Sequence, residues 1–220
     1  MPRAMPRDMV AAAALAAGAA LLLYLLTRRR TPKQAPQSPV AALASPPRPV
    51  EPPSDIHVLH SGGLASDASE MLQAALAKAT SGATTCHLHS MTDFKKFSTQ
   101  YALVDRASPL HVVFIVATIE NEQPPEDAGP CVRFFNRRTH APDMLANRLV
   151  YAVLGLGDSN LLLDRQTTTA KDCNQVARRL DSRLAALGGK RFHAIGETDD
   201  RTGNQELDPW IASCVAELAR

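Results

Sequence analysis

Strongly apolar runs alternate with segments of helical period along residues 55–220, and this alternation constrains the fold more than any other feature. The run Leu110–Thr118, LHVVFIVAT, is apolar almost throughout, which is typical of a central parallel strand covered on both faces. Leu149–Leu156, LVYAVLGL, has the same character. The weaker candidate strands are Ile56–His60, Thr84–His89 and Phe192–Ile195.

Helices are predicted between these runs, where apolar residues recur every three or four positions. The clearest is Thr169–Leu187, which Gly188 would end. The other helical segments are Asp67–Thr80, a segment capped by Thr92, Ala128–Asn147, which prolines break, and Pro209–Leu218. Five strands that alternate with helices predict an α/β fold with a doubly wound five-stranded parallel sheet. Ligands of such sheets bind beyond the carboxyl ends of the strands, here at the loops that begin at Ser61, Ile119, Gly157 and Glu197.

An uncharged apolar run near the N-terminus predicts a membrane anchor. Met9 to Leu26 holds 18 residues without charge, and at about 1.5 Å per residue it approaches the thickness of a bilayer core. Arg28, Arg29 and Arg30 follow directly, and this heavier positive flank places the rest of the chain in the cytosol. We therefore expect a tail at 1–8, a transmembrane signal anchor at 9–27, a linker at 28–54 and a globular domain at 55–220.

Two alternatives to this anchor fit the pattern less well. A cleaved signal peptide would carry its basic region before the apolar run and small residues at the cleavage site. A mitochondrial presequence would be amphipathic rather than uniformly apolar. The run is rich in alanine and only moderately hydrophobic. Both the endoplasmic reticulum and the mitochondrial outer membrane therefore stay open as the location.

The segment after the anchor is basic and then rich in proline. Eight prolines lie between Thr31 and Ser54, and proline fixes φ and lacks the amide N–H that helices and sheets need. We interpret the segment as an extended spacer, with a ligand for a proline-recognition domain as the alternative.

Charge and cysteine content exclude several classes of protein. Residues 1–54 carry a net charge of +5, and residues 55–220 carry −3 without a basic stripe, which argues against a nucleic-acid partner. The four cysteines form no C-x-x-C motif and no dense disulfide framework. We expect reduced thiols that are buried as small apolar side chains.

Three stretches that follow predicted strands carry a resemblance to a known family. ATIENEQPPEDA (Ala117–Ala128) is similar to the family pattern ATYGNGEPPDNA, and VLGLGDSN (Val153–Asn160) matches the next flavin loop. LAALGGKRFHAIGETDD (Leu184–Asp200), with DPW at Asp208–Trp210, resembles the last strand and helix. Together, over residues 55–220, they resemble the flavodoxin-like FMN-binding domain of the diflavin reductases, the family of microsomal NADPH–cytochrome reductase and methionine synthase reductase.

The resemblance implies which residues would hold FMN. In this family the first loop cradles the phosphate, and the next two loops clamp the flavin ring. Carried over position by position, the cofactor-binding candidates are Ser61, Gly62, Gly63, Ser66, Thr118, Asn121, Gly155, Gly157, Asp158, Asn160 and Asp199.

The sequence departs from the family pattern mainly at positions that would face the ligand. Asp67 would lie near the phosphate, and Glu120 and Glu122 replace two glycines. Ile119 stands where a stacking tyrosine is frequent, and Leu161 replaces the more regular one. An insertion of about nine residues, around 162–170, follows. We expect FMN binding that is weakened or lost, since each lost stack costs about 1–3 kcal/mol by analogy with base stacking.

Two other groups of residues were candidates for function. His57, His60, His87 and His89 lie on two predicted strands, but no third metal ligand is placed by sequence, so ordinary structural histidines are favoured. Acidic residues gather at the predicted flavin edge. They are interpreted either as ordinary solvated charges on loops or as a surface that docks a basic redox partner. They are Glu120, Glu122, Glu126, Asp127, Asp158, Asp164, Glu197, Asp199 and Asp200.

Two functions remain open from the sequence. The first is a membrane-anchored carrier that takes electrons from a separate flavin reductase and passes them singly to a haem or iron–sulfur protein. The chain would then be at most an oxidoreductase component, since the resemblance implies no FAD or NADPH domain within these 220 residues. The second is a flavin-free flavodoxin-like scaffold that serves protein contacts at a membrane.

Overall fold

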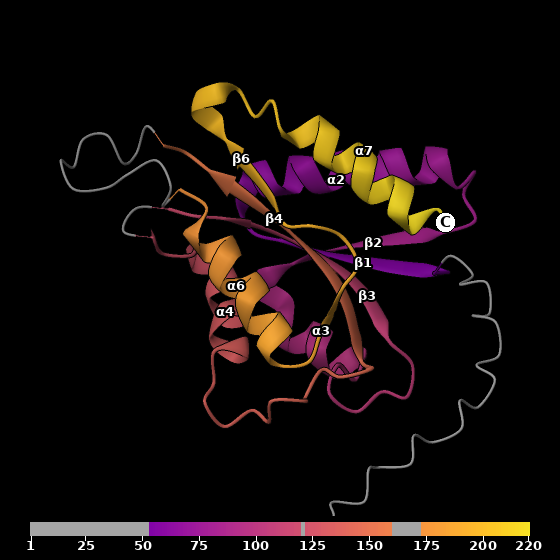
Figure 1. Ribbon diagram of the computed structural model, residues 1–220, viewed down its shortest axis with the longest axis vertical. Coiled ribbons are helices and arrows are strands. Elements are labelled where there is room, and N and C mark those ends of the chain that lie inside the picture. Colours follow the sequence, from indigo (N-terminus) through magenta and orange to yellow (C-terminus); the bar gives the residue numbers. More distant parts are fainter. Residues whose placement is uncertain (1–52, 120–121, 160–172) are drawn as a thin grey trace, which may run out of the picture. The chain divides into compact units, whose positions relative to one another are not determined.

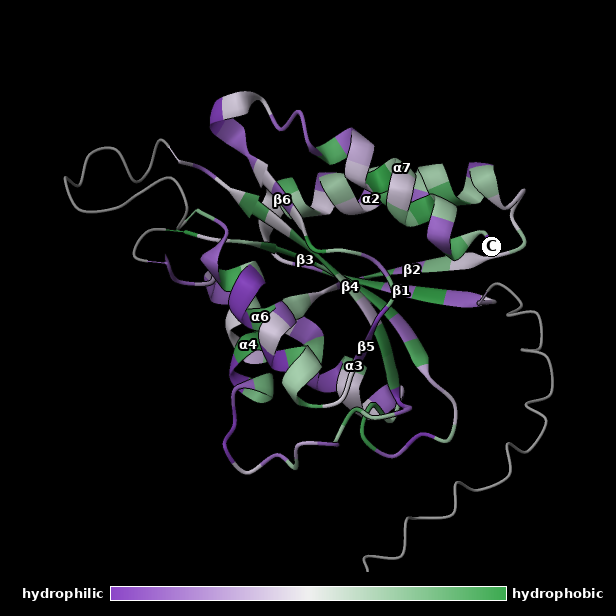
Figure 2. Ribbon diagram, viewed as in Figure 1, coloured by the Kyte–Doolittle hydropathy of each residue, from purple (hydrophilic) through white to green (hydrophobic). Residues whose placement is uncertain are grey.

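The two most apolar runs of the chain form the centre of a parallel sheet. In the computed structural model, which describes residues 53–119, 122–159 and 173–220, β3 (Leu110–Ala117) pairs in parallel with β4 (Leu149–Gly157). Most side chains of both strands are buried, because helices cover both faces of the sheet. Figure 2 shows the hydrophobic residues concentrated along these strands.

The remaining strands extend the sheet on both sides of this pair. β1 (Asp55–His60) lies between β3 and β2 (Thr85–Ser90), and β4 pairs with both β5 (Lys190–Arg191) and β6 (Gly196–Asp199). The strand order is β2-β1-β3-β4-β5, with β6 off this path. Every strand pair of the described sheet is parallel. The predicted doubly wound parallel sheet is therefore confirmed.

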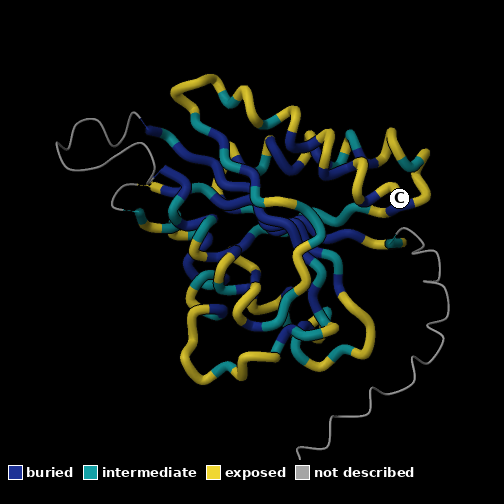
Figure 3. The backbone as a smooth tube through the Cα atoms, in the orientation of Figure 1, coloured by how far each residue is buried: buried dark blue, intermediate teal, exposed yellow. Residues whose placement is uncertain are grey.

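The helices of the described residues form the two outer layers (Figure 1). α2 (Gly62–Ala79) and α7 (Leu207–Leu218) cover one face of the sheet, where Leu72 and Ile211 pack with Val113. The other face carries α3 (Phe94–Gln100), α4 (Gly129–Phe135) and α6 (Gln175–Ala186). Short 3₁₀ turns complete the described elements: η1 (Met91–Asp93), η3 (Glu126–Ala128) and η5 (Asp200–Thr202). Figure 3 shows the buried strands between these layers.

The predicted fifth strand, Phe192–Ile195, is wrong in position. The sheet instead contains β5 (Lys190–Arg191) and β6, and the residues between them belong to neither strand. The carbonyl of Ala194 accepts a hydrogen bond from the indole Nε1 of Trp210 at 2.9 Å, so it is turned toward α7 rather than into the sheet. The strand resumes at Gly196, where a Cβ atom would lie 2.5 Å from the Trp210 ring.

Several helix boundaries also differ from the predictions. α2 begins at Gly62 rather than at Asp67, so almost no loop separates it from β1. Thr92 does not cap α3; the Ser90 hydroxyl accepts a hydrogen bond from the Thr92 N–H at 3.2 Å at the start of η1. α4 ends at Phe135, far short of Asn147.

The predicted tail and anchor, 1–8 and 9–27, and all but the last two residues of the predicted linker lie outside the described residues. Within the described ranges, no helix is long and apolar enough to cross a membrane. All four cysteines are free, and Cys131, Cys173 and Cys214 are buried, as expected for structural thiols. Burial raises the pKa of Cys86 to about 11.

Candidate functional site

Four strands end at one edge of the sheet and bring most of the predicted cofactor residues together. Ser61 follows β1, Thr118 follows β3, Asp158 follows β4, and Asp199 is the last residue of β6. The register places Gly157 opposite Asp199, and the Thr118 N–H donates to the Leu156 carbonyl at 3.0 Å. In sheets with this strand order, ligands bind at the carboxyl ends where the chain reverses its direction of winding, between β1 and β3.

Ser61 joins the ends of β1 and β3. Its side chain is fully buried, and its hydroxyl accepts a hydrogen bond from the Ala117 N–H at 3.1 Å. Its own N–H donates to the Ile115 carbonyl at 3.1 Å. Ser61 therefore holds two strand ends in register, and its hydroxyl is turned into the protein.

The N-terminus of α2 is closed by a carboxylate from a distant part of the chain. Gly62 adopts a φ of +74°, which glycine allows without strain, and its N–H donates to Asp127 Oδ2 at 2.5 Å. The Ser61 side chain makes no capping hydrogen bond. Gly63 is exposed in the first turn, whereas Ser66 lies one turn into the helix, where its carbonyl accepts from the Ser69 hydroxyl.

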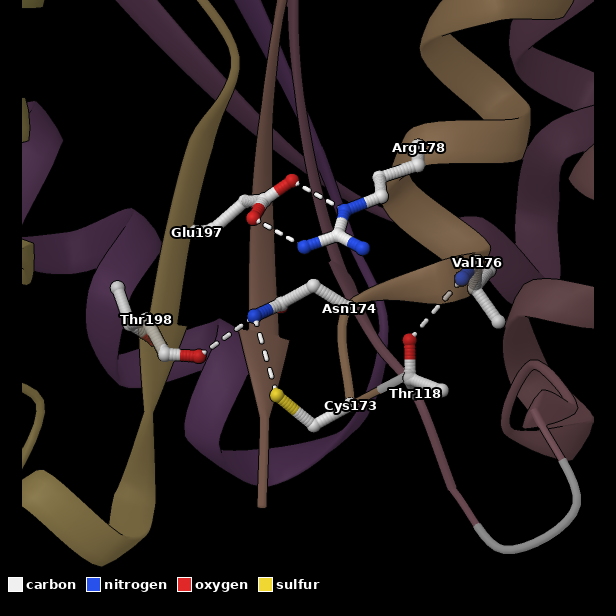
Figure 4. A network of polar contacts seen from close by, with 7 residues as sticks. All are labelled: Thr118, Cys173, Asn174, Val176, Arg178, Glu197 and Thr198. Carbon is white, nitrogen blue, oxygen red and sulfur yellow. Dashed lines mark hydrogen bonds and ion pairs between the residues drawn. The ribbon is translucent and has the colours of Figure 1, made fainter. Parts of the chain in front are cut away.

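The loop after β3 is tied to the start of α6 (Figure 4). The Thr118 hydroxyl accepts a hydrogen bond from the Val176 N–H at 3.1 Å, and Asn174 Nδ2 donates to the Thr198 carbonyl at 2.9 Å. Arg178 forms a two-pronged ion pair with Glu197, both contacts at 2.6 Å. These contacts fix α6 against β3 and β6.

Gly155 and Gly157 allow the segment before α6 to approach β4 closely. A Cβ atom on Gly155 would lie 2.6 Å from Asn174 Oδ1 and 2.7 Å from Ala177 Cβ. A Cβ atom on Gly157 would lie 2.6 Å from the carbonyl oxygen of Cys173. In the described part of the site, these glycines are accounted for by packing against the protein itself.

Asp199 organises the loop that follows β4. Its Oδ1 accepts hydrogen bonds from the Ser159 N–H at 2.9 Å and from the Arg201 N–H at 3.1 Å. Burial works against the charged form, but hydrogen bonds from Ser159 and Arg201 outweigh it and hold the pKa of Asp199 below its ordinary value. Asp158 is half-buried beside it.

The loop after β3 keeps a left-handed backbone at a position predicted to need glycine. Glu122 has a φ of +56°, and its carboxylate forms an ion pair with Arg179. Ile119 is 43% exposed, and its N–H donates to the Gln123 carbonyl at 2.9 Å. The candidates Asn121 and Asn160, like Glu120 and Leu161, lie outside the described residues.

A comparison with protein families identifies the fold. The family described as flavodoxin matches residues 65–212, well over half of the chain. The chain belongs to the flavodoxin family. This membership indicates FMN as the cofactor and confirms the resemblance seen in the loop sequences.

Curated relatives of this flavodoxin-family chain include large flavin reductases. Methionine synthase reductase of Bos taurus is 36% identical over 124 residues, which cover 56% of this chain and 16% of the relative. NADPH-dependent diflavin oxidoreductase 1 of Danio rerio is 34% identical, covering 51% of this chain and 18% of the relative. NADPH–cytochrome P450 reductase of Candida tropicalis is also 34% identical, covering 53% and 14%. The matched part is less than a fifth of the length of these relatives.

Solved structures agree on the fold. A cysteine-to-serine mutant of flavodoxin from Pseudomonas aeruginosa superposes with a TM-score of 0.50 and covers 76% of this chain and 99% of its own. Its sequence is 17% identical, so the likeness concerns the fold alone.

The described residues have the fold that binds FMN, but the N-terminus of α2, where the phosphate group would bind, is already occupied by a carboxylate. The strand order and the strand ends are those of the family. However, the first N–H of α2, an N-terminus of the kind that commonly binds phosphate, already donates to the Asp127 carboxylate. The hydroxyls of Ser61 and Thr118 also accept hydrogen bonds from the backbone. The assignment of individual candidates to FMN therefore stays a prediction.

The sequence did not predict which carboxylate contacts the start of α2. Asp67, which was expected near the phosphate, is exposed on α2, whereas Asp127 accepts the hydrogen bond from the Gly62 N–H. Asp127 was noted only as one of a group of acids. Nothing local in the sequence marks a contact between residues 65 positions apart.

The histidines also come together in a way that the sequence did not predict. His57 lies opposite His87 in the sheet register, and its Nδ1 lies 3.1 Å from His89 Nε2. Asp55 pairs with His87 at 3.1 Å. Among the described residues, no group of three or more histidines, cysteines or acids is arranged to hold a metal ion.

Proposed function

We propose that the chain is an FMN-dependent electron carrier that works with a separate reductase. The observation that carries the proposal is the flavodoxin-family match over residues 65–212 together with the parallel sheet in the order β2-β1-β3-β4-β5. The edge between β1 and β3 is where this topology binds its ligand. The carrier takes electrons from a flavin reductase and passes them one at a time to a haem or iron–sulfur protein.

The chemistry of this function belongs to the cofactor rather than to side chains. FMN supplies the redox reaction when it is bound, and no residue has to act as an acid or a base. The chain's own residues hold the strand ends, orient the loops and shield the site. Ser61, Thr118 and Asp199 serve this role through hydrogen bonds that fix the loops after β1, β3 and β4.

The partner is proposed to dock at the acidic edge of the sheet. Several of the acids there are neutralised within the chain, since Glu122 pairs with Arg179 and Glu197 pairs with Arg178. Glu126 and Asp200 are exposed and can attract a basic partner. The relatives' names, which mention methionine synthase and cytochrome P450, favour a redox protein as this partner.

Electron transfer from a supplied reductase to cytochrome c tests the proposal. The full chain is incubated with FMN, freed of excess flavin, and mixed with NADPH and a diflavin reductase that lacks its own FMN domain. The proposal predicts cytochrome c reduction that depends on the chain and on its FMN. Equal rates with and without the FMN-loaded chain would contradict it.

A flavin-free scaffold is the second candidate function. The contact between Asp127 and the Gly62 N–H favours it, because a carboxylate already stands where an anion would bind. In this case the chain would bind neither FMN nor riboflavin at high micromolar concentration, and its surface would serve protein contacts only.

Membrane attachment is a separate part of the proposal. It is supported by the uncharged run Met9 to Leu26 and by the arginines that follow it. We propose a single-pass anchor in the endoplasmic reticulum or the mitochondrial outer membrane, with residues 31–220 in the cytosol. Carbonate washing should leave the chain in the membrane, and protease should digest the domain in sealed organelles. Release by carbonate, or full protection from protease, would contradict this topology.

A further inference from the structure

The contact between Asp127 and α2 joins two segments that are fixed independently. Asp127 lies in η3, whose Ala128 is fully buried and donates its N–H to the Pro125 carbonyl at 3.0 Å. Gly62 follows Ser61, which is held by the end of β3. The 2.5 Å hydrogen bond from Gly62 N–H to Asp127 Oδ2 therefore results from the packing of the domain.

A carboxylate at this place competes with any other anion. The first N–H groups of a helix lack partners within the helix, and the helix end carries partial positive charge. Phosphate groups bind such ends for the same reason that a carboxylate does. At the β1/β3 edge a phosphate would have to displace Asp127 or bind beside its negative charge.

The Asp127 carboxylate is only partly satisfied by its contact with α2. Its second oxygen, Oδ1, is buried and has no hydrogen-bond partner among the described residues, and the same holds for Nδ1 of the neighbouring His60. Burial lowers the pKa of His60, while the charge of Asp127 acts in the opposite direction. Asp127 also lines a hollow of about 620 Å³ together with Arg133, whose positive charge offers the carboxylate a second place to lie.

We propose that Asp127 is a built-in competitor for the cofactor phosphate, so that the chain holds FMN weakly and discriminates little between FMN and riboflavin. This inference rests on the proposed function for the identity of the ligand. It assigns the weak point of the site to a residue that the cofactor-loop pattern does not mark. Flavin affinity in this chain is then set by whether Asp127 stays on the helix or swings away.

The direct test compares FMN with riboflavin, which lacks the phosphate. Both are titrated by fluorescence quenching into the full chain and into Asp127→Asn, which keeps the size and an acceptor oxygen but removes the charge. We expect FMN to bind the variant about tenfold more tightly or better, since tenfold corresponds to the ~1.4 kcal/mol of one charge-assisted contact. Riboflavin affinity should change by less than about twofold. Equal changes for both flavins would overturn the proposal.

Glu126→Gln is the matched control, because Glu126 is the exposed neighbour of Asp127 in the sequence and the change removes the same charge. If Glu126→Gln raised the affinity for FMN as much as Asp127→Asn does, the effect would be one of general charge. This result would contradict a specific role of the Asp127 contact. Asp127→Ser provides a second variant with a short acceptor and should behave like Asp127→Asn.

Inorganic phosphate separates this proposal from the proposed function. We expect phosphate to raise the thermal midpoint of Asp127→Asn more than that of the native chain, although the flavin-free variant starts lower because a charged cap is lost. If no flavin binds any variant but phosphate still stabilises Asp127→Asn selectively, the electron-carrier function fails and the competitor role of Asp127 stands. If phosphate stabilises the variant no more than the native chain, the proposal is wrong.

Discussion

Glu122 has a backbone conformation that suits glycine better than glutamate. Its φ of +56° is the left-handed conformation that the family pattern fills with glycine, and a side chain there costs about 1–2 kcal/mol. The ion pair with Arg179 compensates only in part, since exposed pairs contribute about 0–1 kcal/mol. The sequence indicated this strain because the loop pattern has glycine at this position, and the requirement for a positive φ depends only on the local backbone.

Replacing Glu122 by glycine and by alanine separates these two effects. Both changes remove the ion pair, but only glycine relieves the left-handed backbone. We expect Glu122→Gly to exceed Glu122→Ala in free energy of unfolding by about 1–2 kcal/mol in urea titrations of the full chain. Equal stabilities would show that the loop relaxes at this position.

His57 is a buried group whose protonation should destabilise the fold. Burial is the main cause that lowers the pKa of His57 to about 4, and repulsion from His89 and His87 adds to it. The charge of Asp55 acts in the opposite direction, and Arg106 lowers the pKa slightly further. The unfolded chain binds this proton near pH 6.5, so between pH 6.5 and 4 it holds more protons than the folded chain. Stability is therefore fully present above about pH 6.5 and falls as the pH drops toward 4.

Urea unfolding at pH 7.5 and at pH 4.5 measures this effect. We expect the native chain to lose about 1–3 kcal/mol more on acidification than His57→Gln does. His140→Gln is the control, because His140 lies outside the cluster and hydrogen-bonds to the Phe134 carbonyl. An acid sensitivity of His57→Gln as large as that of the native chain would contradict the role of His57.

At the level of elements, close packing at the start of α6 gives Gly155 and Gly157 a role within the fold, while their role in binding FMN stays a prediction. The sequence marks Gly155 and Gly157 clearly, but it cannot say whether a ligand or a helix needs the space. Here Asn174, Ala177 and Cys173 fill it. The strands themselves were predictable because their apolar runs are long. The interrupted last strand was not, since it depends on Trp210, which reaches back to Ala194.

Gly155→Ala tests this packing. The added methyl would meet Asn174 Oδ1 at 2.6 Å and Ala177 Cβ at 2.7 Å, so we expect a loss of about 1–3 kcal/mol in the free energy of unfolding. Gly63→Ala is the matched control, because no described atom lies within 4 Å of its Cβ position and alanine favours a helix by up to about 1 kcal/mol. Similar stabilities of the two variants would mean that α6 shifts without cost.

At the scale of the whole molecule, the scaffold follows the family and the phosphate end departs from it. The parallel sheet and its layers could be predicted because they arise from patterns repeated along the chain. The closure of α2 by Asp127 could not, because a single contact over 65 residues leaves no periodic trace. We therefore expect an electron carrier that binds its cofactor weakly.

The visible spectrum of the purified full chain shows whether it holds FMN. After incubation with excess FMN and gel filtration at low phosphate, we expect flavin absorption bands that elute with the protein, at less than one flavin per chain. Asp127→Asn treated in the same way should retain more flavin. Colourless protein in both cases would contradict the claim that this chain is an FMN-dependent electron carrier.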